Sequence, residues 1–148
     1  MAVRALLTAF VLLLATALAS ALISYESMRQ DWRTSHMLFA HGWVEQNPRF
    51  TISGRANDVP LVCSEGMGRI RGAALTVLRD SAINNLSGRV IERLFVARYP
   101  RRKKLIRTLS WIERVAFASA VTYINSADHL RQAAANRRMA REYGYDER

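Results

Sequence analysis

An unbroken apolar run near the N-terminus constrains this chain more than any other feature. Residues 5–23 carry no charge and are rich in Leu, Val and Ala, with Arg4 before them and Glu26 after them. A helix of this length extends roughly 28 Å, which is close to the hydrocarbon thickness of a bilayer. Residues 1–23 are therefore predicted to be an N-terminal transmembrane anchor, with the N-terminus in the cytoplasm.

A cleaved signal peptide is the alternative interpretation of the same segment. Arg4 would form the positive n-region and residues 5–16 the apolar h-region, and Ala17-Leu18-Ala19 would be an A-x-A site with cleavage after Ala19. The anchor predicts a protein of the bacterial inner membrane with one secure span and two further spans left open. Cleavage would instead release a periplasmic or secreted domain.

The composition indicates a single basic domain. The chain has 148 residues, and its 22 Lys and Arg outnumber its 12 Asp and Glu, which gives a net charge of +10. Lys occurs only at positions 103 and 104, and this dominance of Arg is typical of a GC-rich bacterial genome. The single cysteine, Cys63, excludes a disulfide within the chain.

Helical spacing of apolar residues predicts an all-α fold, with the N-terminal membrane helix followed by an amphipathic helical hairpin in a small bundle. The segments after residue 23 are an amphipathic helix at 24–47, a loop at 48–66, the hairpin at 67–135, and a polar tail at 136–148 that is predicted to be disordered. An aromatic stripe along the first of these helices is predicted to pack against the hairpin, the bilayer or a partner. It consists of Tyr25, Trp32, Phe39 and Trp43.

The hairpin is predicted to turn at Tyr99-Pro100, where proline favours a new helix start. In its first helix, the apolar face consists of Ala74, Val77, Leu78, Ile83, Leu86, Val90, Leu94 and Ala97. The opposite, charged face consists of Arg71, Arg79, Asp80, Arg89, Glu92 and Arg93. Positive charge gathers at the turn, beside apolar helix ends. This pattern indicates either a solvated loop that aids solubility or a contact with anionic headgroups. The residues of this basic turn are Arg98, Arg101, Arg102, Lys103, Lys104 and Arg107.

A short motif lies between the first helix and the loop. Its residues are Asp31, Thr34, Ser35, Gly42, Glu45, Asn47 and Pro48. This arrangement resembles the D-x-x-x-T/S…G-x-x-E-x-N-P pattern of small uncharacterised bacterial helical membrane proteins, in which a membrane helix leads into the motif and a helical hairpin follows. The resemblance implies a membrane location and no known activity, so the role of the motif is unknown.

Catalytic and cofactor motifs are absent from the sequence. It contains no phosphate-binding glycine loop and no nucleophile elbow, and His36 and His41 lack the spacing of a metal pair on a helix. We therefore predict no cofactor, no metal site and no catalytic residues. A small hydrolase using Cys63, or His41 with Glu45, is the enzymatic alternative.

These observations predict a non-enzymatic helical membrane protein that acts as a structural or accessory component. Its expected partners are membrane lipids, and a larger membrane complex or a second copy of the chain is the further possibility. The alternative is an exported soluble domain that binds an anionic ligand or polymer through its arginines. Nucleic acid is not favoured as a partner, because the chain has basic charge but no nucleic-acid-binding motif.

Overall fold

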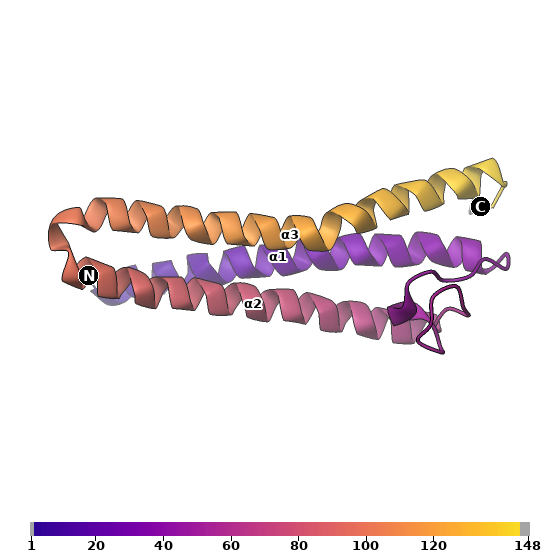
Figure 1. Ribbon diagram of the computed structural model, residues 1–148, viewed down its shortest axis with the longest axis horizontal. Coiled ribbons are helices and arrows are strands. Elements are labelled where there is room, and N and C mark those ends of the chain that lie inside the picture. Colours follow the sequence, from indigo (N-terminus) through magenta and orange to yellow (C-terminus); the bar gives the residue numbers. More distant parts are fainter. Residues whose placement is uncertain (1, 146–148) are drawn as a thin grey trace. The chain divides into compact units, whose positions relative to one another are not determined.

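The computed structural model describes residues 2–145, and side chains from residue 15 onward. Within this range the chain forms three α-helices, α1 (Ala2–Phe39), α2 (Cys63–Arg98) and α3 (Lys103–Glu142), and has no strand (Figure 1). Two short 3-10 helices, η1 (Pro48–Phe50) and η2 (Pro100–Arg102), lie in the connections. The prediction of an all-α fold is thus confirmed. The 3-10 helix η2 begins at Pro100, where the hairpin was predicted to turn.

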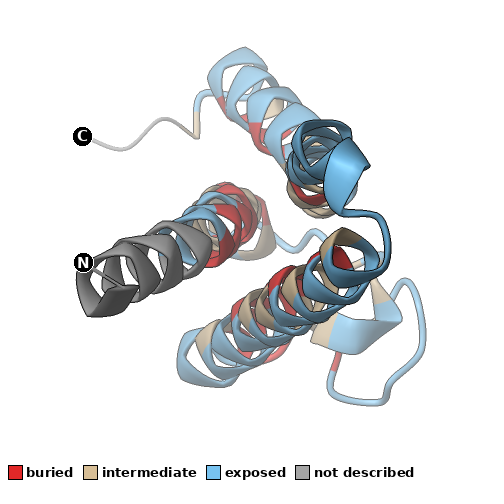
Figure 2. Ribbon diagram, turned by 90° about the vertical axis from the view of Figure 1, so that its left-hand side faces the viewer, coloured by how far each residue is buried: buried red, intermediate tan, exposed pale blue. Residues whose placement is uncertain are grey.

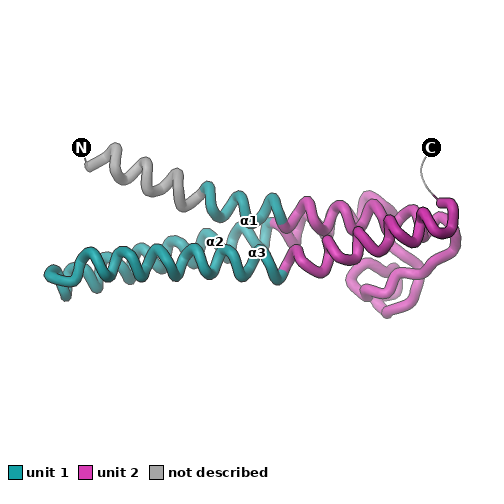
Figure 3. Tube along the Cα trace, turned by 90° about the horizontal axis from the view of Figure 1, so that it is seen from above, with its two compact units in different colours: residues 1–23, 75–124 teal, residues 24–74, 125–148 magenta. Residues whose placement is uncertain are grey.

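The helices contribute to two compact units, each assembled from segments far apart in the sequence. Unit 1 comprises Met1–Ile23 and Leu75–Ile124, and unit 2 comprises Ser24–Ala74 and Asn125–Arg148 (Figure 3). Each unit therefore holds part of all three helices and is described by itself.

In unit 1, α2 and α3 form an antiparallel hairpin that polar side chains hold in register. The hydroxyl of Ser110 donates to the carbonyl of Gly88 at 3.4 Å, and Asn84 Nδ2 donates to Glu113 Oε1 at 3.3 Å. Nearer the turn, Arg114 donates to Glu92 at 3.3 Å, and both side chains are buried. These contacts fix the pairing of the two helices through hydrogen bonds and charge.

The distribution of residues in unit 1 differs from that of a soluble helical bundle. Among the side chains that the structure describes in this unit, most buried ones are small, polar or charged, with Val77 as the larger apolar one: Ala17, Ser20, Ala21, Val77, Ser81, Asn85, Glu92 and Arg114. Its large apolar residues are exposed, including Leu86, Val90, Ile91, Leu94, Phe95, Leu105, Leu109, Trp111 and Ile112. The helical periodicity of α2 was predicted correctly, and Ala74 and Val77 of its predicted apolar face are buried, whereas Leu86 and Leu94 of the same face are exposed. The charged face supplies the buried Glu92. Buried, intermediate and exposed residues occur along each helix (Figure 2).

Unit 2 has an apolar core built around Trp32. The buried cluster consists of Met28, Trp32, Leu61, Ile70 and Ala74, and the partly buried Tyr25, Phe39, Phe50 and Met67 pack against it. Three members of the predicted aromatic stripe therefore lie in or beside this core. The fourth, Trp43, follows the end of α1 and is 38% exposed.

Both α1 and α3 end in a Schellman motif closed by glycine. Gly42 has φ +87°, and the Trp43 amide donates to the Leu38 carbonyl at 3.3 Å. At the end of α3, Gly144 has φ +71°, and the Tyr145 amide donates to the Ala140 carbonyl at 2.7 Å. The first of these motifs follows the end of α1 at Phe39, whereas the helix was predicted to continue to residue 47.

The two C-terminal ends are joined by aromatic contacts. His41 stacks on Tyr145 with ring centroids 3.7 Å apart, and Trp43 meets Tyr143 edge to face at 5.8 Å. The segment predicted as a disordered tail thus differs in the structure, where α3 continues to Glu142 and its residue Asn136 is 1% exposed. Packing against α1 supplies the order that its polar sequence did not suggest.

The loop between α1 and α2 is folded back on itself. Two isolated antiparallel bridges pair Glu45 with Asp58 and Thr51 with Pro60. The Glu45 and Asp58 backbones exchange hydrogen bonds of 3.0 and 3.2 Å, and the Leu61 amide donates to the Phe50 carbonyl at 2.8 Å. These bonds place Glu45 and Phe50 in defined positions beside the helices of unit 2.

Among the residues that the structure describes, no helix combines the length and apolar character needed to cross a membrane. Most of the predicted N-terminal span falls in residues 1–14, and the structure does not describe the side chains of these residues. The anchor and the signal peptide at residues 1–23 therefore both stay predictions.

Candidate functional site

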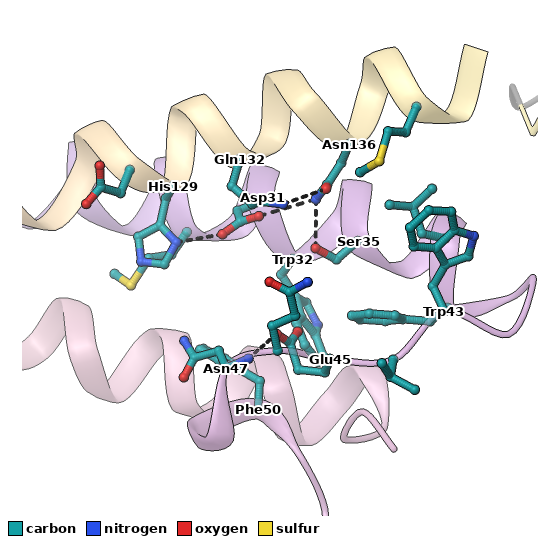
Figure 4. A pocket seen from close by; sticks show the side chains of 17 residues that line it. Asp31, Trp32, Ser35, Trp43, Glu45, Asn47, Phe50, His129, Gln132 and Asn136 are labelled. Atoms are coloured by element: carbon teal, nitrogen blue, oxygen red, sulfur yellow. Dashed lines mark hydrogen bonds and ion pairs between the residues drawn. The ribbon is translucent and has the colours of Figure 1, made fainter. Parts of the chain in front are cut away.

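A pocket of about 370 Å³ lies in unit 2, bounded by α1, the loop that follows it and α3 (Figure 4). Residues from the predicted motif line it on one side, and residues of α3 line it on the other. The polar lining residues are Asp31, Ser35, Glu45, Gln46, Asn47, Asp128, His129, Gln132 and Asn136. No residue that lines the pocket is Lys or Arg.

Asp31 is the centre of a hydrogen-bond network between α1 and α3. Its Oδ2 atom lies 2.7 Å from Nδ1 of His129, and because an ionised carboxylate only accepts hydrogen bonds, Nδ1 carries the proton of this contact. Its Oδ1 atom accepts a longer contact of 3.5 Å from Nδ2 of Asn136. Asp31 is thereby held at the pocket wall with its side chain 18% exposed.

Asn136 extends the network along α1. Its Nδ2 donates to the hydroxyl of Ser35 at 2.8 Å and approaches the hydroxyl of Thr34 at 3.3 Å, and its Oδ1 accepts from Gln132 at 2.9 Å. These partners satisfy the amide of a fully buried side chain, which would otherwise be costly to bury. Figure 4 shows the Asn136 side chain directed toward Asp31 and Ser35.

Glu45 lies in the pocket wall formed by the loop. Its Oε1 accepts a hydrogen bond of 2.7 Å from the Asn47 backbone N–H. Burial raises the pKa of the Glu45 carboxyl, and the negative charge of Asp31 raises it further, although the hydrogen bond from Asn47 acts in the opposite direction. The pocket wall thus carries two carboxylates, and the charge of Asp31 disfavours the ionised form of Glu45.

Aromatic side chains supply the apolar part of the pocket. Trp32, Phe39, Trp43 and Phe50 all line it. The Trp32 ring lies 5.1 Å from that of Phe50 and 6.1 Å from that of Phe39, so these three rings form one packed surface. The pocket thus combines acidic groups with an aromatic wall.

The structure brings most of the predicted motif together, although the sequence assigned it no role. Asp31, Ser35, Glu45 and Asn47 line the pocket, and Thr34 is buried. The remaining two residues, Gly42 and Pro48, shape the backbone. Gly42 closes the end of α1, and Pro48 begins η1, where Asn47 is the N-cap and accepts a hydrogen bond of 3.0 Å from the Arg49 amide.

The predicted basic turn lies in unit 1, apart from the residues of this pocket. Arg98, Arg101, Arg102, Lys103, Lys104 and Arg107 are all exposed. Arg98 lies over the ring of Tyr99, 5.8 Å from its centroid, and Arg107 Nε is 3.8 Å from Glu92 Oε1. The other four cations have no ion pair with a described carboxylate.

Sequence reasoning missed the contribution of α3 to the pocket. No sequence motif included His129, and Asn136 fell at the start of the tail that was predicted to be disordered. One signal was available, because His129, Gln132 and Asn136 recur at spacings of three and four and so share a helical face. Only the tertiary structure shows that this polar face meets Asp31.

The residues of the enzymatic alternative lie in separate surroundings. Cys63 is exposed at the start of α2, and His41 stacks on Tyr145 with its Nδ1 atom 2.8 Å from the Met37 carbonyl. Among the described residues, no hydrogen bond joins His41 to Glu45, and no group of three His, Cys, Asp or Glu side chains could hold a metal ion.

Comparisons of the chain with protein-family models, with curated proteins and with solved structures each found no match.

Proposed function

We propose that this protein is a non-enzymatic helical component of the bacterial inner membrane, in which unit 1 lies against lipid and serves a structural or accessory role. The observation that carries the proposal is the arrangement of unit 1, where large apolar side chains are exposed while small, polar and charged ones are buried. Leu94 is 65% exposed and Leu86 is 66% exposed, whereas Glu92 and Arg114 are each 7% exposed.

Lipid explains this arrangement better than water does. Helices in a bilayer pack through small residues and bury ionisable groups in pairs, and Ala17, Ala21 and the Glu92–Arg114 pair of unit 1 follow this pattern. Other charged side chains of the same helices, such as Arg93 and Glu113, are exposed. In water, large apolar side chains exposed in this number favour an interaction site. Lipid contact removes the cost of exposing it.

The basic turn supports contact at the headgroup level. Its arginines and lysines adjoin the exposed Phe95, Tyr99 and Leu105, so positive charge borders apolar and aromatic surface. Anionic headgroups attract such clusters by about 1 kcal/mol per cation near the surface. This agrees with a helical hairpin whose apolar surface reaches the acyl boundary while its turn stays among the headgroups.

A fluorescent label attached to cysteine tests this placement in the full chain. The native Cys63 is exposed in unit 2 and provides the reference position. A C63S/L94C variant moves the label to an exposed position in unit 1. In vesicles containing phosphatidylglycerol, we expect brominated acyl chains to quench the label at position 94 strongly and the label at position 63 weakly, and a water-soluble quencher to give the reverse order.

The comparison between the two labels does not depend on the N-terminal segment, because both variants retain it. Equal access of the water-soluble quencher to the two positions would contradict the proposal. Such a result would favour the exported domain that binds an anionic ligand.

A further inference from the structure

We propose that the unit 2 pocket binds a small organic ammonium group, held between the carboxylates of Asp31 and Glu45 and against the aromatic wall. This inference rests on unit 2 alone and does not depend on contact between unit 1 and lipid.

The charge of the pocket is opposite to that of the protein. The chain carries 22 Lys and Arg residues and a net charge of +10, yet none of those cations lines the pocket. Of the three lining carboxylates, Asp128 is exposed and pairs with Arg131 at 2.8 Å. Asp31 and Glu45 remain as the partly buried acidic groups, and a pocket of this kind selects a cation.

Two helix ends add to the negative potential. The last turns of α1 and α3 contribute Leu38, Phe39 and Met139 to the pocket lining. The aligned peptide dipoles give a helix C-terminus a partial negative charge, which favours a nearby cation, although the Schellman motifs pair most of the last carbonyl groups of both helices. The C-terminal turns of α1 and α3, which end at Gly42 and Gly144, therefore contribute to the same pocket as Asp31 and Glu45.

The aromatic wall favours an organic ammonium over a metal ion. Trp43, Phe39 and Phe50 present ring surfaces to the pocket, and alkylammonium groups bind to such surfaces through cation–π attraction and apolar contact. The volume of about 370 Å³ falls at the small end of ligand pockets, which span roughly 300–1,000 Å³. It suits an ammonium with a short organic body.

The electrostatic effect of Asp31 on Glu45 also favours the binding of a cation. Burial and the Asp31 charge both disfavour the ionised form of Glu45, so its pKa is raised in the ligand-free pocket. A bound ammonium would relieve the repulsion between the two groups. Asp31 is already oriented by His129 and Asn136, so the site is partly preorganised for this role.

Calorimetric titration of the full chain in a non-ionic detergent tests the proposal with choline as the probe. The matched control ligand is the uncharged isostere of choline, in which a quaternary carbon replaces the nitrogen. We expect choline to bind at least about tenfold more tightly than this isostere, because only choline gains the carboxylate and cation–π contacts. Equal binding of the two ligands, or no binding of choline, would overturn the proposal.

Variants locate the binding to this pocket. Glu45→Gln keeps the oxygen that accepts from Asn47 and removes the charge, so we expect choline affinity to fall about tenfold or more. Glu65→Gln makes the same change at an exposed position on α2 and should leave affinity unaltered. Trp43→Leu gives an independent test, because Trp43 is 38% exposed and lies outside the buried core, and it should weaken binding several-fold. Unaltered affinity in a folded Glu45→Gln variant, or in Trp43→Leu, would refute the assignment.

A short-chain phosphocholine lipid, used below its micelle concentration, distinguishes two sources of the ammonium group. Tighter binding of this lipid than of free choline would identify a lipid headgroup as the source. Preference for free choline would identify a soluble ion. Either outcome retains the ammonium as the group that is bound.

Discussion

The indole of Trp32 lies directly against the backbone of Gly66, so closely that a Cβ atom at position 66 would overlap its six-membered ring. Trp32 is 3% exposed and is central to the unit 2 core, and Gly66 lies in the second turn of α2. The absence of a side chain at position 66 therefore allows α1 and α2 to approach within unit 2. The same contact positions Trp32 at the base of the pocket.

Replacing Gly66 with alanine is expected to destabilise the protein by at least about 2 kcal/mol, because either the indole or the helix must move. Gly68 provides the matched control, since it lies in the same helix and nothing is within 4 Å of its Cβ position. There, alanine should stabilise the protein by up to about 1 kcal/mol through helix propensity. Unfolding followed by circular dichroism measures both changes, and a loss of the same size in the two variants would contradict this role of Gly66.

The buried ion pair of unit 1 should respond asymmetrically to substitution. Glu92→Ala leaves Arg114 buried without its carboxylate and is expected to cost about 3–5 kcal/mol. The double substitution E92L/R114M removes both charges and should recover most of that loss. The exposed pair of Arg138 and Glu142, with side chains 77% and 56% exposed, is the control, and Glu142→Ala should change stability by no more than about 1 kcal/mol. A double variant as unstable as Glu92→Ala would show that the pair itself is not the cause.

The contact between Asn136 and Ser35 predicts a measurable coupling between α3 and α1. In a double-mutant cycle with N136A and S35A, we expect an interaction energy of about 1 kcal/mol, the usual contribution of one hydrogen bond. A parallel cycle that pairs N136A with S64A, at an exposed position on α2, should give a value close to zero. Unfolding free energies of the single and double variants supply both values, and indistinguishable couplings would argue against the contact.

His36 predicts a loss of stability in mild acid. Burial lowers the pKa of its imidazole below the ordinary value of 6.5, and its Nε2 atom has no hydrogen-bond partner among the described residues. The unfolded chain binds a proton near pH 6.5, whereas the folded chain does so only at lower pH. The stabilising contribution of neutral His36 is thus complete above pH 6.5 and is lost as pH falls toward the folded pKa.

The difference in unfolding free energy between the native protein and His36→Leu isolates this effect. Other groups also titrate in acid, with the pKa of Glu26 and of Asp58 lowered and that of Glu45 raised, but their contributions cancel in the difference. We expect the native protein to lose stability relative to the variant between pH 7 and pH 5. A difference that does not vary over this interval would contradict the assignment.

The sequence by itself determined the helices and their main break. Apolar residues at spacings of three and four predicted the all-α fold, and Pro100 predicted the turn of the hairpin, because backbone geometry and local propensity act over a few residues. The residues from Asp31 to Pro48 were also recognised as a motif, since their pattern is local. Their role could not be predicted, because their partners lie far away along the chain.

Only the tertiary structure decided which faces the helices bury and which side chains meet. Helical periodicity placed Leu94 and Glu92 on different faces of α2, but it could not specify that Glu92 would be buried against Arg114 and Leu94 exposed. The contact of Asp31 with His129 spans 98 positions of sequence. Such contacts depend on how the helices pack, and periodicity describes each helix only in isolation. The formation of each helix is therefore a local property of this sequence. The pocket of unit 2 and the exposed apolar residues of unit 1 depend instead on how the helices pack.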